Sequence, residues 1–279
     1  MKRVVYGSET DRAKYIYHYT SAETAIKYIL ATKTLRFGSY SDTNDPYENK
    51  RWKFHFASYT ENCDLSKMSF EEISALSEKL NDEIKINFFL ACFSTDGRLT
   101  GDTVIDIHQR GYGKPRMWAQ YGDGHEGVCL IFNQRKLKES VLSTFQDSGV
   151  IMEGGVNYLD NKVVPNLNTS PFGVQYEIFS EMGLEKYAWQ HVRWHYKELF
   201  FTKNTDWKSE AEYRVAIHKP SKTPVVVDIS GSLEGIVFGN NCDEKNISLI
   251  VSMFPNINYE QIVWDNWSPW YSFRKDLNQ

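Results

Sequence analysis

Short segments of the chain alternate between apolar and polar residues or are apolar throughout, and both patterns predict β-strands. In residues 15–19 three tyrosines alternate with Ile16 and His18, so the two sets of side chains are expected on opposite faces of one strand. Residues 88–93 and 128–132 are apolar throughout, which is typical of strands buried on both faces. Further strands are predicted at residues 34–37, 212–217, 224–229, 235–238 and 259–264.

Apolar residues at helical spacing predict helices between these strands. The sequence from Thr20 to Glu23 has the form of a capping box, which would make Thr20 the N-cap of the first helix. A long, polar, glycine-rich segment at residues 94–116 is typical of a mobile loop or lid. Because helices come early and in the middle while strands cluster late, the order favours an α+β fold over a regular βαβ winding. The helices are expected at residues 22–30, 47–56, 70–84, 176–194 and 243–254.

The length of 279 residues would allow two domains, but no repeat, low-complexity segment or Pro- and Ser-rich linker divides the chain. We therefore expect a single α+β domain over residues 1–279, with a central mixed sheet flanked by helices. No apolar run reaches the roughly 18 residues of a membrane span, and residues 1–15 lack the apolar core of a secretion signal. The sequence thus predicts a cytoplasmic protein that does not bind membranes.

The charge and the cysteines narrow the possible chemistry. A formal net charge of −4 argues against a dedicated nucleic-acid-binding protein, although a local basic patch remains possible. The four cysteines form no C-x-x-C pair, which removes the sequence basis for a zinc ribbon or a redox pair. Cys92 and Cys129 lie within apolar runs, so we interpret them as small buried core residues.

Two further patterns resemble known sites without matching them. His191 and His195 have a spacing that can bind a metal, but no glutamate follows His191 directly and no third ligand is indicated. We interpret them as a structural pair and predict no metal site. The stretch from Gly122 to Gly127 reads G-x-G-x-x-G, but it precedes a strand instead of following one, so we interpret it as a tight turn and not as a Rossmann loop.

Four polar and aromatic segments remain as candidates for chemistry. They lie at residues 17–20, 44–46, 117–127 and 201–214. The motifs in or next to them are Y-H-Y-T at 17–20, N-D-P at 44–46, W-x-x-Y with H-x-G-x-C at 118–129, and W-x-x-E-x-E-Y-R at 207–214. With these motifs the sequence resembles a large bacterial family that is known only as a domain of unknown function, number twenty-nine seventy-one. The resemblance runs from the first strand to Ile217 and implies a grouping without an activity, because the family has no settled one.

A more distant similarity is to the ADP-ribosyltransferase superfamily, notably its DNA-modifying toxin branch. The early histidine, the hydroxyl residue that follows it and a helix leading into a T-L-R strand carry this resemblance. It implies an ADP-ribosyltransferase-like fold in which His18 and Thr20 hold NAD as a substrate and Glu210 and Glu212 form a catalytic pair. The serine-rich middle motif of the superfamily is missing. Both glutamates would lie on one face of a strand if Glu210 is already extended.

The implied reaction breaks the bond between nicotinamide and ribose, which builds positive charge on the ribose that a carboxylate stabilises. We assign this role to Glu212, and Glu210 would orient or deprotonate the acceptor. His18 would bond a ribose hydroxyl and Arg36 would pair with the pyrophosphate. Further candidate contacts to NAD are Tyr19, Thr20, Asn44, Asp45, Trp118, Tyr121, Trp207 and Arg214, with Trp118 or Tyr121 stacking on a ring.

Each candidate also has a purely structural interpretation that the sequence leaves open. These interpretations are a hydrogen-bonded core histidine for His18, an N-cap for Thr20, an Asx turn for Asn44 and Asp45, a salt bridge between Glu212 and Arg214, and core packing for Trp118 and Trp207.

The leading hypothesis is an NAD-dependent ADP-ribosyltransferase-like enzyme that modifies a nucleic acid or a protein, as a bacterial toxin or anti-phage effector. One alternative is a nucleic-acid-processing or nucleic-acid-binding defence protein in which Arg110, Lys114 and Arg116 contact phosphates. Another is a non-catalytic nucleotide sensor with an aromatic pocket. The leading hypothesis requires that His18 and the acidic pair open onto one cavity. For a residue in such a cleft, Glu212→Ala is expected to abolish turnover with little change in melting temperature.

Overall fold

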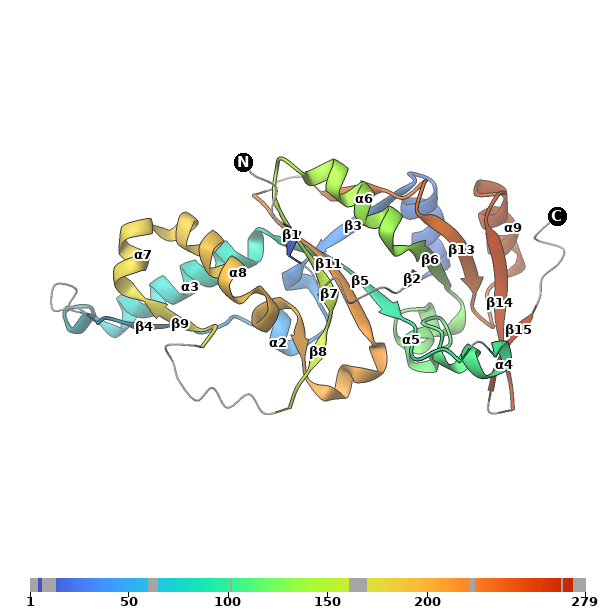
Figure 1. Cartoon of the computed structure of the whole chain (residues 1–279), viewed down its shortest axis with the longest axis horizontal. Coiled ribbons are helices and arrows are strands. Elements are labelled where there is room, and N and C mark those ends of the chain that lie inside the picture. The colour runs from blue at the N-terminus through green and yellow to red at the C-terminus, as the bar shows by residue number, and fades with distance from the viewer. Residues whose placement is uncertain are drawn as a thin grey trace.

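The computed structural model describes residues 5–6, 14–59, 65–100, 102–160, 170–220, 224–266 and 268–272. Within these residues the main sheet has eleven strands and contains both parallel and antiparallel pairs. Helices flank this sheet, which confirms the predicted α+β class with a central mixed sheet (Figure 1). No helix of the described residues combines the length and apolar character needed to cross a bilayer.

The strands of the main sheet are β1 Val5–Tyr6, β2 Tyr15–Thr20, β3 Thr34–Ser39, β5 Phe88–Thr95, β6 Val128–Asn133, β7 Val150–Gly155, β11 Glu212–His218, β12 Val225–Asp228, β13 Leu233–Phe238, β14 Asn258–Asp265 and β15 Ser268–Ser272. Their order is β1-β7-β11-β5-β2-β6-β13-β14-β15, with β3 pairing to β5 and β12 off this path. Two small sheets pair β4 His55–Ala57 with β9 Gly173–Gln175, and β8 Asn157–Tyr158 with β10 Thr202–Lys203.

The helices are α1 Ala22–Thr24, α2 Pro46–Asn49, α3 Phe70–Ile86, α4 Thr103–Asp106, α5 Pro115–Gln120, α6 Gln134–Phe145, α7 Tyr176–Met182, α8 Leu184–Phe200 and α9 Glu244–Met253. Short helical turns add η1 Ala25–Leu30, η2 Tyr40–Asp42, η3 Leu65–Lys67, η4 Ile107–Gln109, η5 Asp123–His125 and η7 Thr205–Glu210.

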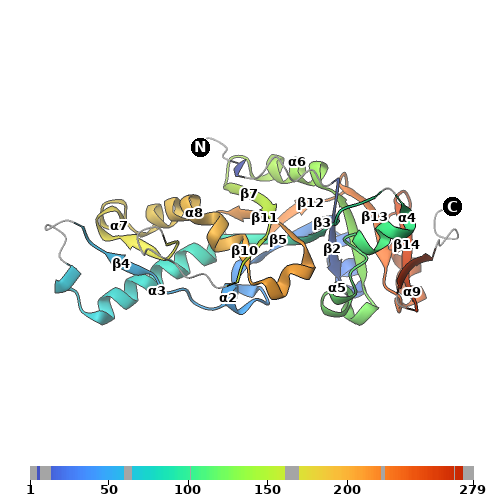
Figure 2. The same cartoon turned by 60° about the horizontal axis from the view of Figure 1, so that its bottom comes forward.

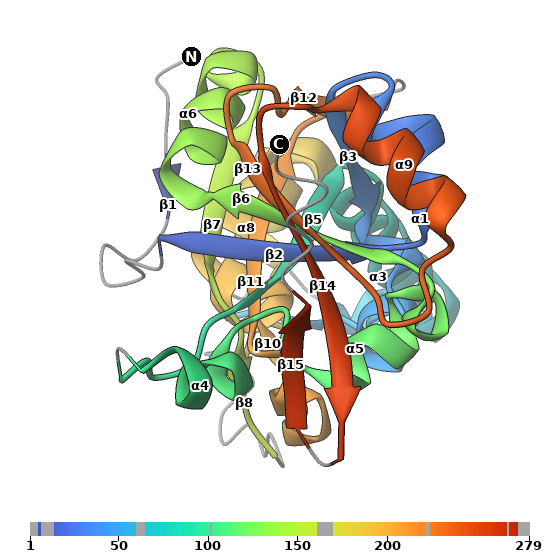
Figure 3. The same ribbon diagram turned by 90° about the vertical axis from the view of Figure 1, so that its right-hand side faces the viewer.

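Helices cover both faces of the sheet. Apolar residues of α6, α9 and η1 pack into one core with alternate residues of β2, β5 and β11. Residues of α3 and α8 pack on the opposite face of β5 and β11, and α5 packs against β2 and β6. Figure 3 shows this arrangement, with α6 and α9 above β2 and with α4 and α5 below it. Figures 1 and 2 show α3, α7 and α8 gathered at one end of the molecule, away from α9 and β13 to β15.

The N-cap of the first helix lies one residue later than predicted, although the helix begins at Ala22 as expected. Thr20 still belongs to β2, where it pairs with Val128 of β6. Ser21 is the N-cap instead, because its side-chain oxygen accepts a hydrogen bond from the backbone N–H of Thr24 at 3.1 Å. The predicted capping box at Thr20 is therefore wrong, since pairing with a neighbouring strand keeps this residue extended.

The helix predicted at residues 47–56 ends at Asn49. The backbone N–H groups of Trp52 and Phe54 donate to the side chains of Asn81 and Ser77 on α3, at 2.9 and 2.8 Å. Because these side chains replace the carbonyl acceptors of a helix, the segment stays extended and leads into β4.

The helix predicted at residues 176–194 is interrupted by Gly183, whose φ of 74° separates α7 from α8. A positive φ is easily adopted by glycine and ends a helix. The pattern analysis also missed α6 and β7, although β7 is a six-residue strand of the main sheet, between β1 and β11. The predicted polar loop at residues 94–116 contains α4 and is anchored by Ile107 and Tyr112, which are both buried.

His218, at the end of β11, is a buried histidine without a hydrogen-bond partner among the described residues. Its ring packs on that of Trp189, with 4.4 Å between the centroids. Burial lowers the pKa of His218 to about 3. The folded protein therefore holds this imidazole neutral at pH values where the unfolded chain would protonate it.

We expect His218 to make the protein less stable as the pH falls below about 6.5. Between that pH and about 3 the unfolded state binds one proton more, so the free energy of unfolding decreases by up to about 1.4 kcal/mol per pH unit from this residue. The variant His218→Leu should show a shallower pH dependence in urea unfolding followed by tryptophan fluorescence. The exposed His55→Leu serves as the control, and equal slopes for the wild type and His218→Leu would contradict the prediction.

Candidate functional site

The main sheet forks along one edge of β5. Near its end β5 pairs with β2, at Ser94 and Thr95, whereas near its start it pairs with β3, at Phe89 and Leu90. Residues 91–93 lie between these two pairings, where β2 and β3 diverge. A cavity of about 280 Å³ opens here, with walls from β2, β3, β5, β10, β11, α2, α5 and the turn η7.

His18 lies in this fork. Its Nδ1 atom is 2.9 Å from the backbone oxygen of Cys92, in the part of β5 between the two pairings. Because a carbonyl oxygen only accepts hydrogen bonds, Nδ1 carries the proton and Nε2 is left as an acceptor. Burial lowers the pKa of His18, against the opposing effect of this hydrogen bond, so the ring is neutral near pH 7.

Glu210 and Glu212 both line this cavity, but Glu210 does so from a turn and not from the strand that contains Glu212. Glu210 ends the turn η7 and is not extended, and Ala211 adopts a left-handed conformation with φ of 44°. The backbone oxygen of Ala211 accepts hydrogen bonds from the N–H and the hydroxyl of Thr95, which hold the turn against β5. The condition under which strand alternation would align the two glutamates, an extended Glu210, is therefore not met.

Lys203 of β10 links the two carboxylates. Its Nζ lies 3.0 Å from Glu210 Oε2 and 2.8 Å from Glu212 Oε2, and all three side chains are at most 7% exposed. The hydroxyl of Tyr121 donates to Glu210 Oε1 at 2.9 Å. Burial lowers the pKa of Lys203, but Glu212 and the other carboxylates outweigh it and raise the pKa above its usual value. Lys203 is thus a fixed cation between the two acids.

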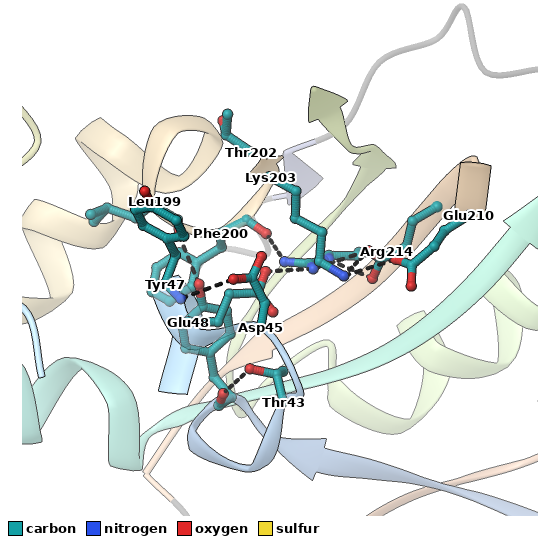
Figure 4. A network of polar contacts seen from close by, with 12 residues as sticks. Thr43, Asp45, Tyr47, Glu48, Leu199, Phe200, Thr202, Lys203, Glu210 and Arg214 are labelled. Atoms are coloured by element: carbon teal, nitrogen blue, oxygen red, sulfur yellow. Dashed lines mark hydrogen bonds and ion pairs between the residues drawn. The ribbon is translucent and has the colours of Figure 1, made fainter. Parts of the chain in front are cut away.

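Arg214 connects Glu212 to a third acid, Glu48 of α2. Its Nε donates to Glu212 Oε1 at 2.7 Å. Its Nη2 donates to Glu48 Oε1 at 2.6 Å, and its Nη1 donates to the backbone oxygen of Phe200 (Figure 4). Burial would raise the pKa of Glu212, but Arg214 and Lys203 lower it to about 2. The sequence left a salt bridge between Glu212 and Arg214 as an alternative to a catalytic role, and the structure contains this salt bridge.

The cluster carries an excess of negative charge. When every group is ionised, the three carboxylates of Glu48, Glu210 and Glu212 face the two cations of Lys203 and Arg214, which leaves one net negative charge beside the cavity. A cation or a group that develops positive charge is favoured in such an environment.

The cavity brings together most of the predicted site residues. Its lining includes His18, Tyr19, Arg36, Asn44, Tyr121, Glu210, Glu212 and Arg214. Sequence reasoning gave no role to Glu48 or Lys203, which also line it. A signal for Glu48 exists in the sequence, since it stands two residues after the N-D-P motif, but an acidic residue in a surface turn is too common to be singled out.

Four predicted contacts lie outside the cavity lining. Thr20 is paired in the sheet, and Asp45 is a buried N-cap whose side chain accepts from the N–H of Tyr47 at 2.9 Å. Trp118 is fully buried, with its Nε1 donating to the backbone oxygen of Tyr112, so it cannot stack on a ligand. Trp207 lies half-buried between two cations, Arg116 and Lys203. The structural interpretations of Asp45 as part of an Asx turn and of Trp118 as a core residue are therefore confirmed.

The remaining sequence candidates are engaged with the protein itself. Arg110 pairs with Asp96 at 2.9 Å, and Lys114 and Arg116 donate to backbone oxygens of Ser209 and Asp206. Arg116 is the exposed member of the three.

The histidines and cysteines of the sequence analysis have separate environments. His191 Nε2 donates to the backbone oxygen of Pro171, and the rings of His191 and His195 lie 4.7 Å apart, as expected of a structural pair. Cys129 is buried in the core. Cys92 instead lies on the cavity wall, so its interpretation as a core residue was incomplete.

Comparison with known proteins supports one of the two resemblances. Residues 117–215 match the model of a family described as "Protein of unknown function (DUF2971)", which confirms the resemblance to that family over this stretch. The stretch contains Tyr121, Lys203, Glu210, Glu212 and Arg214, whereas the motifs around His18 and Asn44 lie before it. No curated protein and no solved structure matches the chain. The similarity to ADP-ribosyltransferases stays a prediction.

Proposed function

We propose that this protein is an ADP-ribosyltransferase-like enzyme that binds NAD in the cavity at the sheet fork and transfers ADP-ribose to a macromolecule. The observation that carries the proposal is the common cavity of His18, Glu210 and Glu212. This is the arrangement that the leading hypothesis required of residues far apart in the sequence. A role as a toxin or anti-phage effector is part of the proposal but rests on the resemblance alone.

Binding would place the nicotinamide half of NAD inside the fork. A volume of about 280 Å³ is at the small end for a ligand pocket, so we expect nicotinamide and its ribose within it. The unprotonated Nε2 of His18 would accept a hydrogen bond from a ribose hydroxyl. The exposed Arg36 lies on the cavity wall and would pair with the pyrophosphate.

The chemical step would use the negative cluster. As the bond from ribose C1′ to the nicotinamide nitrogen breaks, its electron pair leaves with neutral nicotinamide and positive charge develops on the ribose. The carboxylate of Glu212 would stabilise that charge. The acceptor then bonds to C1′, and its proton passes to Glu210, which is held in place by Tyr121 and Lys203.

A second function is favoured by one observation. Both oxygens of Glu212 are already bound by Arg214 and Lys203, which is the pattern of a structural ion pair. A nucleotide sensor that binds NAD without chemistry would need no more than the same cavity.

The test is to incubate the purified protein with NAD, with and without nucleic acid, and to measure nicotinamide release. We expect release that depends on the protein and increases when the right acceptor is present. NAD binding without any release would favour the sensor, and absence of both would overturn the proposal. Binding of nucleic acid that weakens steeply with salt, in a protein that does not bind NAD, would favour the nucleic-acid-binding alternative.

A further inference from the structure

Glu48 has an unused hydrogen-bond acceptor beside the proposed site. Its side chain is 2% exposed, and it lines the cavity. Oε1 accepts from Arg214, but Oε2 is buried and has no partner among the described residues. Asp45 also has an unpartnered buried oxygen, but of these two carboxylates Glu48 is the one that lines the cavity.

The protein donors near Glu48 make their hydrogen bonds to atoms other than its Oε2. The three nitrogens of Arg214 donate to Glu48 Oε1, to Glu212 and to the backbone oxygen of Phe200. Lys203 is bound to Glu210 and Glu212, and the buried Lys85 donates to the backbone oxygens of Glu48 and Lys50. Because a buried carboxylate oxygen without a donor is costly, the missing donor is expected from a molecule in the cavity.

We propose that Glu48 Oε2 accepts a hydrogen bond from the carboxamide N–H of nicotinamide and so makes the cavity selective for NAD over nicotinic acid adenine dinucleotide. This inference rests on the proposed function. Glu48 and Glu212 both accept hydrogen bonds from the guanidinium of Arg214, which Figure 4 shows beside Glu48. A ring attached to a ribose beside Glu212 therefore lies within reach of Glu48.

The same geometry works against a carboxylate on the ring. Nicotinic acid adenine dinucleotide would place an acceptor against the Glu48 oxygen and leave both without a donor. Its negative charge would also meet a cluster that already carries an excess negative charge. Loss of a hydrogen bond to a buried charged group corresponds to a difference in affinity of about tenfold to a hundredfold.

The experiment is calorimetric titration of the wild-type protein with each dinucleotide, with nicotinamide release followed in parallel. We expect NAD to bind at least about tenfold more tightly than nicotinic acid adenine dinucleotide. Equal affinities would overturn the selectivity proposal and leave the proposed function standing. Failure of both dinucleotides to bind would overturn the proposed function, and the inference about Glu48 with it.

The variant Glu48→Gln tests whether the preference for NAD comes from Glu48 Oε2 or from the cavity as a whole. A glutamine can present an N–H to a carboxylate, so the preference for NAD should shrink to within a few-fold. Glu71→Gln, the same change at an exposed position of α3, should keep the wild-type preference. An unchanged preference in a folded Glu48→Gln protein would assign the selectivity to another residue. If this variant fails to fold, equal affinities of the wild type for the two dinucleotides would still overturn the proposal.

Discussion

Nicotinamide release from NAD should be at least about a hundredfold slower in a Glu212→Gln variant than in the wild type. The glutamine keeps the size of the side chain and one acceptor oxygen for Arg214. It removes the charge that would stabilise the ribose in the transition state. Since Arg214 and Lys203 keep Glu48 and Glu210 as partners, the fold should survive the change. The measurement is the initial rate of release at saturating NAD, with circular dichroism as a check of folding.

The control for this prediction is Glu71→Gln, which should retain the wild-type rate. A folded Glu212→Gln protein with full activity would remove Glu212 from the mechanism.

The variant Glu212→Ala, which the sequence analysis suggested, is a poorer test of the mechanism than Glu212→Gln. Glu212 is 6% exposed, so Glu212→Ala would leave Arg214 and Lys203 as buried cations with one partner fewer. The expectation of an almost unchanged melting temperature assumed an open cleft position. Because Glu212 lies in a buried ion pair, we now expect Glu212→Ala to lower the melting temperature.

Replacement of Arg214 by methionine should lower the free energy of unfolding by about 3–5 kcal/mol. Arg214 is 1% exposed and is the shared donor to Glu48 and Glu212, and methionine fills a similar volume without donating. Two buried carboxylates would then face each other with Lys203 as the remaining cation. Urea unfolding followed by tryptophan fluorescence measures the effect.

Arg135→Met is the matched control for this loss of stability. Arg135 pairs with Glu139 on the surface of α6, where its side chain is 76% exposed. Exposed pairs of this kind contribute about 0.5 kcal/mol or less, so the control should remain near the wild type. A loss below about 1 kcal/mol for Arg214→Met would show that the cluster tolerates an unpaired acid, for example by protonation of Glu48. Burial already raises the pKa of Glu48, against the effect of Arg214.

Local patterns were sufficient for much of the fold. The alternation in residues 15–19 predicted β2 with its tyrosines on one face, and the apolar runs predicted β5 and β6. Helical spacing predicted α3 and α9. The residues that set each of these patterns lie within one short segment, so the pattern predicts the element in any fold that buries one of its faces. The elements that were misjudged, such as the broken helix at Gly183, depend on a single backbone angle or on contacts with distant side chains.

The candidate site was predicted in part, because its residues stand out by chemistry. A histidine at the end of an early strand and two glutamates near a late strand were recognisable as a set, and the structure brings them to one cavity. Pattern alone could not separate Tyr121 from Trp118. The two are three residues apart in one motif, and yet Tyr121 lines the cavity while Trp118 is sealed in the core.

By itself, the sequence determined many of the segments that become strands or helices and which residue types are available for chemistry, because those properties depend mainly on neighbours along the chain. The tertiary structure decided where the sheet opens. The fork exists because Tyr17 and Gly38 pair with opposite ends of β5, at Ser94 and Leu90. It also decided that Glu48, from a four-residue helix, meets Arg214, which is 166 positions further along the chain. Such contacts are set by how the elements pack in space, and no periodicity of a single segment records them.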